Sequence, residues 1–292
     1  MYWYLELATS IPIGSGSTTS SSSKLILQAP SLTKHISAVL LLYTAMASAQ
    51  TLIWSDEFSQ PNGSPPDLAK WSFQIGGGGW GNNELEYYTS RQKNAHISNN
   101  NLVITAFNEK YTGPDGITRN YTSARMMTLY KFSQMYGHFE ARIKIPYGQG
   151  LWPTFWMLGD NIDKVGWPAC GEIDIMENIG SEPSIIHGTI HGPGYKRAGI
   201  GAAFTLPNNQ HFSANYHVFS IDWYPNSVKF YVDGTLYETR TPKDLPLGGV
   251  WVFDHPFYIL LNVAVGGNWP GDPDATTVFP QTMLVDYVRV YQ

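Results

Sequence analysis

Three carboxylates lie in the strand-like segment 172–177 (EIDIME). Burying an unpaired charge costs free energy, so acids are rare in a half-buried strand unless they are paired or used. Side chains of a strand alternate between its faces, so Glu172 and Asp174 share one face and Glu177 has the wrong parity. A β-bulge, common beside active sites, would bring Glu177 onto that face. Two glutamates with a third acid between them are the groups that cleave a glycosidic bond.

Two other interpretations fit three acids in a short segment. They could form the solvated face of an ordinary strand, or they could ligate a hard cation such as calcium or magnesium. The apolar residues between the acids indicate that one face is buried, so the other faces a cleft or bulk water. Trp152, Trp156 and Trp167 precede the acids closely and favour a cleft, because sugar rings stack on aromatic side chains. A tryptophan taken alone is more often part of a core.

The elements that must position these acids are predicted to be strands. Apolar and polar residues alternate with a period of two in several segments, and Asp233-Gly234 between apolar runs indicates a two-residue hairpin turn. No stretch of a dozen residues after residue 50 has helical periodicity, and there is no internal repeat or linker. This pattern predicts one all-β domain, a sandwich or a barrel. The predicted strand segments are 102–106, 138–145, 219–223, 230–232, 236–237 and 283–291.

Two glycine-rich segments, 76–83 and 266–271, carry Trp80 and Trp269. The first lacks the spacing and the following helix of a phosphate-binding loop, so nucleotide binding is not expected. Both segments are either ordinary turns or the rim of a cleft, where each would present a tryptophan on flexible backbone. The sequence leaves these two interpretations open.

Composition and charge exclude several classes of protein. Of the 292 residues, 43% are hydrophobic, 14% charged and 14% aromatic, which suits a globular β-protein with a carbohydrate-binding surface. The net charge is -5 with no basic run, so we expect no nucleic-acid partner and a neutral rather than an acidic glycan. Cys170 is the one cysteine, so no internal disulfide forms. The neighbouring acids would raise the pKa of its thiol, which argues against a catalytic cysteine.

The N-terminal part resembles a targeting segment rather than a part of the fold. An apolar run at 36–46 follows two basic residues, and the small-x-small pattern of 47–49 precedes Gln50. The run is too short to be a permanent membrane span. We therefore predict a signal peptide that is removed before Gln50.

The segment before that signal is unusually long. Residues 1–33 include a Ser/Thr/Gly-rich stretch without periodicity, which is typical of disorder, and this favours a translation start near Leu32. We therefore expect residues 1–49 to be a disordered leader plus signal peptide, and residues 50–292 to be one catalytic domain. The mature protein is expected to be secreted, either extracellular or periplasmic.

A series of separate motifs in residues 52–292 resembles glycoside hydrolase family 16, and within it the bacterial laminarinase-type endo-β-1,3-glucanases. The motifs occur in the family's order, and together they are more specific for the family than the acid segment is alone. They are 54–58 (WSDEF), 83–89 (NELEYYT), 121–125 (YTSAR), 136–142 (YGHFEAR), 150–159 (GLWPTFWMLG), 167–177 (WPACGEIDIME), 187–193 (HGTIHGP), 253–257 (FDHPF), 266–271 (GGNWPG) and 286–291 (DYVRVY).

The resemblance implies an all-β fold, a β-jelly-roll sandwich of two curved antiparallel sheets around an open substrate cleft. It also implies hydrolysis with retention of configuration. Glu172 would be the nucleophile and Glu177 the acid/base, and Asp174 would hydrogen-bond the nucleophile and tune the pair. The extra residue between the glutamates is typical of the bulged, laminarinase-like branch of the family.

The expected substrate is a β-1,3-glucan such as laminarin, cut at internal bonds by a monomeric enzyme. Mixed-linkage β-1,3-1,4-glucan and galactans are alternative substrates, and a non-catalytic glucan-binding module is an alternative function. Such modules lose the catalytic glutamates, which this chain keeps. The candidate stacking platforms are Trp152, Trp156 and Trp167, and the candidate hydroxyl partners are Arg125, His191, Asn82 and Glu84.

No cofactor is expected for catalysis, but the resemblance implies a structural calcium ion away from the cleft. Its ligands would be the backbone of Glu57, the backbone near Asn100 and the carboxylate of Asp286. Asn100 stands where the family usually has glycine. A backbone ligand survives that change if asparagine adopts the same conformation, which it tolerates better than most residues.

Overall fold

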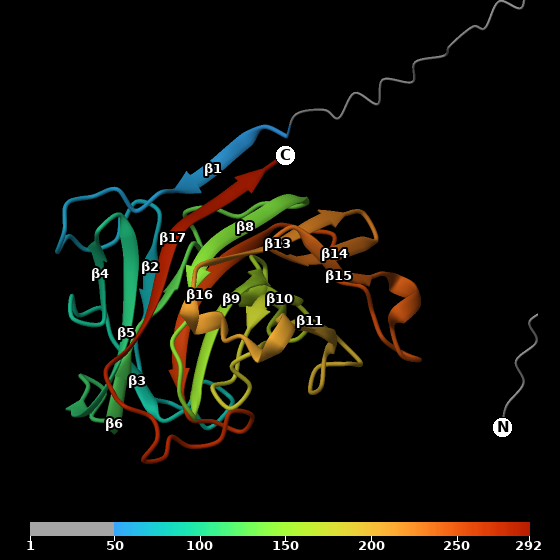
Figure 1. Cartoon of the computed structure of the whole chain (residues 1–292). Coiled ribbons are helices and arrows are strands. Elements are labelled where there is room, and N and C mark those ends of the chain that lie inside the picture. Colours follow the sequence, from blue (N-terminus) through green and yellow to red (C-terminus); the bar gives the residue numbers. More distant parts are fainter. Residues whose placement is uncertain (1–49) are drawn as a thin grey trace, which may run out of the picture. The chain divides into compact units, whose positions relative to one another are not determined.

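Two largely antiparallel β-sheets pack face to face in the computed structural model, which describes residues 50–292 (Figure 1). The larger sheet has ten strands and the smaller has seven. The order β15-β14-β13-β8-β17-β5-β6-β3 runs across the larger sheet, with β1 paired to β17 and β4 to β5. The order across the smaller sheet is β12-β11-β10-β9-β16-β7-β2. The pair β3 and β6 is parallel.

The strands of the larger sheet are β1 (Leu52–Asp56), β3 (Glu86–Tyr88), β4 (Ala95–Ser98), β5 (Asn101–Thr112), β6 (Thr118–Ser123), β8 (Gly137–Lys144), β13 (His217–Tyr224), β14 (Ser227–Val232), β15 (Thr235–Arg240) and β17 (Gln281–Tyr291). Those of the smaller sheet are β2 (Ser72–Gln74), β7 (Arg125–Met127), β9 (Leu151–Gly159), β10 (Glu172–Glu177), β11 (Ile185–His191), β12 (Ile200–Thr205) and β16 (Phe257–Val265). The helical segments are α1 (Ile162–Val165), η1 (Pro207–Asn209), η2 (Phe212–Ala214) and η3 (Pro242–Asp244).

The predicted strands are confirmed, since every segment singled out by its alternation lies in β5, β8, β13, β14, β15 or β17, except that Ile145 follows the end of β8. The hairpin between β14 and β15 turns at Asp233 and Gly234, whose φ angles of 49° and 75° are those of a two-residue turn with both residues left-handed. Within residues 50–292 no helix exceeds four residues, and none is long and apolar enough to cross a bilayer. The predicted leader and signal peptide lie outside the described residues.

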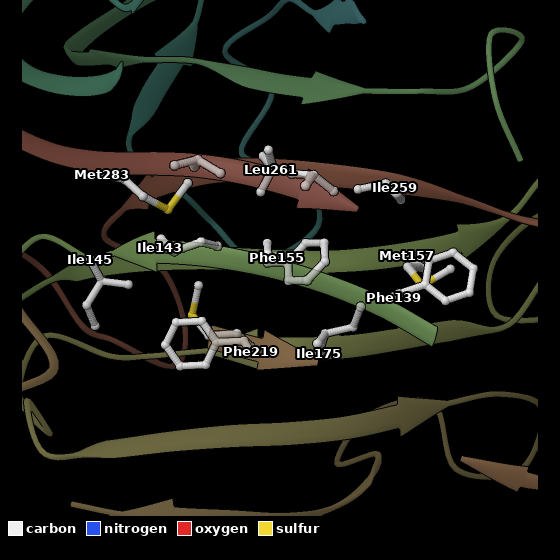
Figure 2. Packing of buried hydrophobic residues seen from close by; sticks show 14 of the residues in the cluster. Phe139, Ile143, Ile145, Phe155, Met157, Ile175, Phe219, Ile259, Leu261 and Met283 are labelled. Carbon is white, nitrogen blue, oxygen red and sulfur yellow. The ribbon is translucent and has the colours of Figure 1, made fainter. Parts of the chain in front are cut away.

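The core lies between the two sheets (Figure 2). Phe139 and Ile143 of β8 face Phe155 of β9 and Leu261 of β16, and all four side chains are fully buried. Each such burial stabilises the fold by roughly 1.5–3 kcal/mol. A one-residue slip of any of these strands would turn its core side chains outward, so the core fixes the register of the strands.

The register in turn fixes what lies on the opposite face of the seven-stranded sheet. In β9, Phe155 and Met157 belong to the core, so Trp152, Thr154 and Trp156 project from the other side. The same alternation applies to the neighbouring strands β7, β16, β10 and β11. We call this side the site face. Its candidate functional side chains are Arg125, Asn262, Trp152, Trp156, Glu172, Asp174, Glu177, His187 and His191.

Candidate active site

The predicted bulge is present in β10. Opposite Asp174 and Met176, the partners on β9 are the consecutive residues 156 and 155, so Ile175 is the extra residue. The pairing with β11 shifts at the same place, between Asp174 and Glu177. Ile175 and Met176 both enter the core, and this restores the parity of Glu177 with the other two acids. The three carboxylates therefore lie on the site face, as the sequence predicts.

Each glutamate is held by a tryptophan. The indole Nε1 of Trp167 donates to Glu172 Oε2 at 2.5 Å, and the indole Nε1 of Trp152 donates to Glu177 Oε1 at 3.1 Å. An indole N–H only donates, so each bond stabilises an oxygen that accepts. The two glutamates differ in exposure. Glu172 is partly exposed and its partner Trp167 is 47% exposed, whereas Glu177 is only 7% exposed. Glu172 is thus the accessible carboxylate and Glu177 the enclosed one.

Asp174 is buried against His191. The Nε2 atom of His191 lies 3.2 Å from Asp174 Oδ2, and its Nδ1 atom lies 3.0 Å from the carbonyl oxygen of Lys196. A carbonyl only accepts, so Nδ1 carries a proton, and Nε2 of a neutral ring would meet Asp174 with a lone pair. The Nε2–Oδ2 contact lacks hydrogen-bond geometry, and Oδ2 has no hydrogen-bond partner among the described residues. A proton on the carboxyl group of Asp174 makes this contact favourable.

The protonation of the acids differs for physical reasons. Burial, and then the charge of Glu172, raises the pKa of Asp174 well above its usual range. Burial, and then the charge of Asp174, likewise raises the pKa of Glu177 well above its usual range, and His191 and Trp152 oppose this only in part. The enclosure of Glu177 therefore favours its protonated form. Glu172 is partly exposed and accepts an indole N–H.

The predicted platform Trp156 has further partners on the site face. Trp156 pairs with Asp174 across the β9–β10 ladder, and its Nε1 atom donates to Asn262 Oδ1 at 2.8 Å. The guanidinium of Arg125, which is 8% exposed, lies 4.7 Å from the centre of the Trp156 ring and 4.9 Å from that of Trp80. Arg125 is thus stacked between two aromatic rings.

The two glycine-rich segments meet at this site. The backbone N–H of Asn268 donates to the carbonyl of Asn82 at 2.8 Å, and the side chain of Asn83 donates to that of Asn268 at 2.8 Å. Trp80, in the first segment, packs on Arg125. Trp269, in the second, is 41% exposed and packs edge-on against Trp152, with ring centres 5.5 Å apart. Of the two interpretations, tryptophans presented at the site fit this arrangement better than ordinary turns.

The predicted hydroxyl partners are not equally placed. Arg125 and His191 lie on the site face, and Asn82 is half-buried in the loop beside it. Glu84 lies deeper, since it is 4% exposed and accepts a hydrogen bond from Tyr88 Oη at 3.1 Å. Direct contact of any of these side chains with a sugar remains a prediction.

Sequence reasoning missed Asn262, Tyr88 and Glu86, which complete the surroundings of Trp156 and Glu84. A signal was available for Asn262, because it is the one polar residue in the fully buried strand β16 (FYILLNVAV). A buried amide needs partners, so a lone asparagine in such a strand indicates a polar network.

Two alternatives can be weighed against this geometry. Glu172, Asp174 and His191 each offer an atom within 4.8 Å of the others, but a hard cation prefers six or more oxygen ligands and this set offers two carboxylates and a nitrogen. Cys170 is fully buried, and burial together with Glu172 raises the pKa of its thiol to about 11, so it is protonated at neutral pH. Neither alternative accounts for the tryptophans on the two glutamates.

The residues predicted to hold calcium come together through strand register. Asp286 is the extra residue of a bulge in β17, between Val285 and Tyr287. Glu57 directly follows β1, whose last residue pairs with 288, and Asn100 directly precedes β5, whose residue 102 pairs with 285. Their backbones therefore flank Asp286.

The donor set fits a hard cation. Asn100 has a φ of 56°, so the expected left-handed conformation is confirmed and its carbonyl is placed as that of glycine would be. One carboxylate and two carbonyls are oxygen ligands of the kind that calcium takes. Arg142 Nη1 lies 2.6 Å from Asp286 Oδ2 and occupies one of the carboxylate oxygens, whereas the carboxylate of Glu57 binds Arg289. An ion here would share Asp286 with Arg142.

Comparisons with known proteins agree with the geometry. The family model "Glycosyl hydrolases family 16" matches residues 82–289. A "Beta-glucanase" of Rhodothermus marinus is 41% identical over 256 residues, which cover 82% of this chain and 85% of that protein. The endo-beta-1,3-glucanase of Pyrococcus furiosus is 53% identical with a TM-score of 0.79 over 83% of this chain and 94% of that one.

A second solved structure is similar to the same extent. The catalytic domain of an endo-1,3-beta-glucanase (laminarinase) from Thermotoga petrophila RKU-1 is 51% identical with a TM-score of 0.78, over 83% of this chain and 98% of that one. These identities extend over nearly the whole described domain, and the family match covers most of it. The predicted jelly-roll sandwich is thereby confirmed, and the chain belongs to glycosyl hydrolase family 16.

Proposed function

We propose that this protein is an endo-β-1,3-glucanase that cleaves internal bonds of laminarin-like glucans with retention of configuration. One observation carries the proposal: two glutamates lie on the same face of a bulged strand, Glu177 enclosed so that burial raises its pKa, and Glu172 accessible. Both solved relatives reported above are named endo-β-1,3-glucanases, which supports the choice of glucan and linkage.

The reaction proceeds in two displacements. Glu177 gives its proton to the glycosidic oxygen as the bond breaks, while a carboxylate oxygen of Glu172 attacks the anomeric carbon and forms a glycosyl-enzyme. Glu177, now ionised, takes a proton from a water molecule, which attacks the same carbon and releases Glu172. Two inversions give net retention. Trp152 and Trp167 each hold one carboxyl oxygen of the two glutamates and so orient both groups.

The role of Asp174 follows from its proton. Its carboxyl group lies within hydrogen-bond reach of Glu172 and next to His191 Nε2. A protonated Asp174 donates to Glu172 and stabilises the carboxylate in the free enzyme and again when the glycosyl-enzyme breaks down. His191, fixed by Lys196, keeps the buried carboxyl in position.

The experiment that tests the proposal is a product profile of the purified protein on laminarin, lichenan, cellulose, agarose and xyloglucan. We expect short oligosaccharides from laminarin at the earliest times, some products from lichenan and none from cellulose, whose bonds are all β-1,4. Proton NMR of the first product should show the β-anomer. Binding of laminarin without release of reducing ends would favour a glucan-binding module instead, and preferential cleavage of agarose would favour a galactanase.

Three further properties belong to the proposal. The mature protein is secreted and begins at Gln50, which N-terminal sequencing of secreted material tests; a chain that starts before Ile36 would contradict it.

A calcium ion is held by the backbones of Glu57 and Asn100 and the carboxylate of Asp286, and the strand register supports this. The enzyme acts as a monomer, which light scattering tests.

A further inference from the structure

A chain of hydrogen bonds leads from the site face into the interior. Trp156 Nε1 donates to Asn262 Oδ1 at 2.8 Å, Asn262 Nδ2 donates to Tyr88 Oη at 3.2 Å, and Tyr88 Oη donates to Glu84 Oε2 at 3.1 Å. Trp156 lies next to Asp174 in the sheet, whereas Tyr88 is fully buried and Asn262 is 4% exposed. We call these four residues, together with Glu86, the relay.

The direction of every bond in the relay is fixed by chemistry. An indole N–H only donates, so Asn262 must present its oxygen to Trp156 and its amide N–H to Tyr88. The tyrosine hydroxyl, having accepted from the amide, gives its own proton to Glu84. All the hydrogens therefore point toward Glu84, and aligned hydrogen bonds of this kind polarise and strengthen one another.

The relay ends at a second pair of acids. The carboxyl group of Glu86 lies within hydrogen-bond reach of Glu84, and Glu86 Oε2 accepts the backbone N–H of Val265 at 2.7 Å. Glu86 is fully buried, and its Oε1 atom has no hydrogen-bond partner among the described residues. Burial, and then the charge of Glu84, raises the pKa of Glu86 well above its usual range. A proton on Glu86 Oε1 satisfies that atom and donates to Glu84.

Burial raises the pKa of Glu84 as well, and the hydrogen bond from Glu86 and the guanidinium of Arg125 oppose this in part, so a charge on the pair is best stabilised at Glu84. Arg125 is stacked between Trp156 and Trp80, and Trp80 packs edge-on against Tyr88 with ring centres 5.4 Å apart. Arg125 therefore contacts both Trp156, which belongs to the relay, and Trp80, which packs on Tyr88 of the relay. Packing alone does not require this arrangement, since burying two carboxyl groups costs free energy that apolar residues would not.

We propose that Tyr88, Glu84 and Glu86 are positioning residues that act through Asn262 and Arg125 to hold Trp156 in one orientation as a sugar-binding surface beside Asp174. The inference rests on the proposed function for its substrate, but the relay itself can be tested without catalysis. It assigns to three residues outside the acid segment a share in glucan binding rather than in bond cleavage.

The central variant is Tyr88→Phe, which removes the hydroxyl group and keeps the ring against Trp80. A hydrogen bond of this kind is worth about 0.5–1.5 kcal/mol, so we expect KM on laminarin to rise about 3- to 10-fold while kcat changes less than about 2-fold. The matched control is Tyr231→Phe, whose hydroxyl donates to Asp222 at 2.7 Å in β14, near the opposite edge of the ten-stranded sheet. That variant should keep both parameters while losing some stability.

The charge assignment is tested at Glu86. A glutamine has the shape of a protonated glutamate, can donate to Glu84 and can accept from Val265, whereas a leucine can do neither. We therefore expect Glu86→Gln to recover most of the affinity for laminarin that Glu86→Leu loses. Equal KM values for the two variants would overturn the assignment of the proton.

A readout independent of activity is the indole ¹⁵N–¹H signal of Trp156, identified by its loss in Trp156→Phe. Loss of the hydroxyl at Tyr88 should move this signal, and Tyr231→Phe should not. An unmoved signal and an unchanged KM in folded Tyr88→Phe protein would overturn the inference while leaving the function intact. If the wild type releases no product from laminarin, the proposed function fails, and the indole signal still decides whether the relay orients Trp156.

Discussion

The protein contains two clusters of acids that share protons in opposite ways. In the outer cluster, Glu172 and Glu177 each accept one indole N–H, and a proton on Asp174 has both Glu172 and His191 within reach. In the inner cluster the hydrogen bonds of the relay run in one direction and end at Glu84, which fixes the positions of their protons. The comparison teaches that the same types of side chain can serve two purposes. A cluster can transfer a proton when that proton has alternative acceptors, and it fixes a geometry when each proton has a single acceptor.

The largest expected effect separates the two clusters. Glu172→Gln and Glu177→Gln should each abolish hydrolysis, because an amide can neither attack the anomeric carbon nor give a proton; acid–base catalysis alone is worth about 10²–10⁴-fold. Reducing-end assays on laminarin measure this, and circular dichroism checks the fold. Azide should partly restore turnover to Glu172→Gly, with products of inverted configuration. Turnover near that of the wild type in either glutamine variant would remove the outer cluster from catalysis.

The next effect concerns the tryptophans on the outer glutamates. Trp152→Ala and Trp167→Ala should lower kcat/KM on laminarin by about 10- to 100-fold, since each ~1.4 kcal/mol of lost binding or positioning is tenfold. Their free energies of unfolding should fall less than the ~3–5 kcal/mol expected for Phe155→Ala in the core. Urea unfolding provides that comparison. A stability loss as large as that of Phe155→Ala would make these tryptophans core residues instead.

The inner cluster should be visible in the pH dependence of stability. The pKa of Glu86 is raised in the folded state, so its contribution to stability is complete below the ordinary glutamate pKa and is lost as pH rises toward the folded value. Over that range the slope approaches about 1.4 kcal/mol per pH unit for one proton. Glu86→Gln should therefore flatten the fall of Tm with rising pH, measured by scanning calorimetry.

Glu109 provides a control, because its pKa is shifted in the opposite direction to that of Glu86 and its effect on stability has the opposite pH dependence. Lys93, Thr122 and Arg91 outweigh the effect of burial and lower the pKa of Glu109 to about 2, so its contribution is present above the unfolded pKa and lost as pH falls. Glu109→Gln should change the acid side of the profile and leave the slope above pH 5 as in the wild type. Parallel Tm profiles for wild type and Glu86→Gln would show that Glu86 is ionised in the native protein.

The smallest effect is that of removing calcium. A ligand that binds only the native state stabilises it by mass action, and about 1 kcal/mol corresponds to ~2–4 °C in a protein of this size. A chelator should therefore lower Tm by a few degrees and leave initial rates at moderate temperature nearly unchanged. Immediate loss of activity, restored by calcium with no change in Tm, would place the ion among the outer acids instead.

Features that depend on residues close together along the chain could be predicted from the sequence. The alternation of 138–145 predicted β8, and the spacing of the acids predicted the bulge at Ile175. The relay could not be predicted, because it joins Tyr88, Trp156 and Asn262 across three strands whose order and register only the folded sheets determine. Glu84 illustrates the limit: its motif indicated a polar role, but its depth depends on what packs over it.

The bulge in β10 also separates two quantities that a regular strand ties together, namely how far apart two side chains are in the sequence and which face they share. With one residue fewer, three acids at alternate positions would still share a face. A bulged segment and a regular segment that is one residue shorter thus place three acids on the same face. An insertion or a deletion, rather than a substitution, converts one into the other. Removing Ile175 is therefore the smallest edit that would change the spacing of donor and nucleophile while leaving every reactive group in the protein.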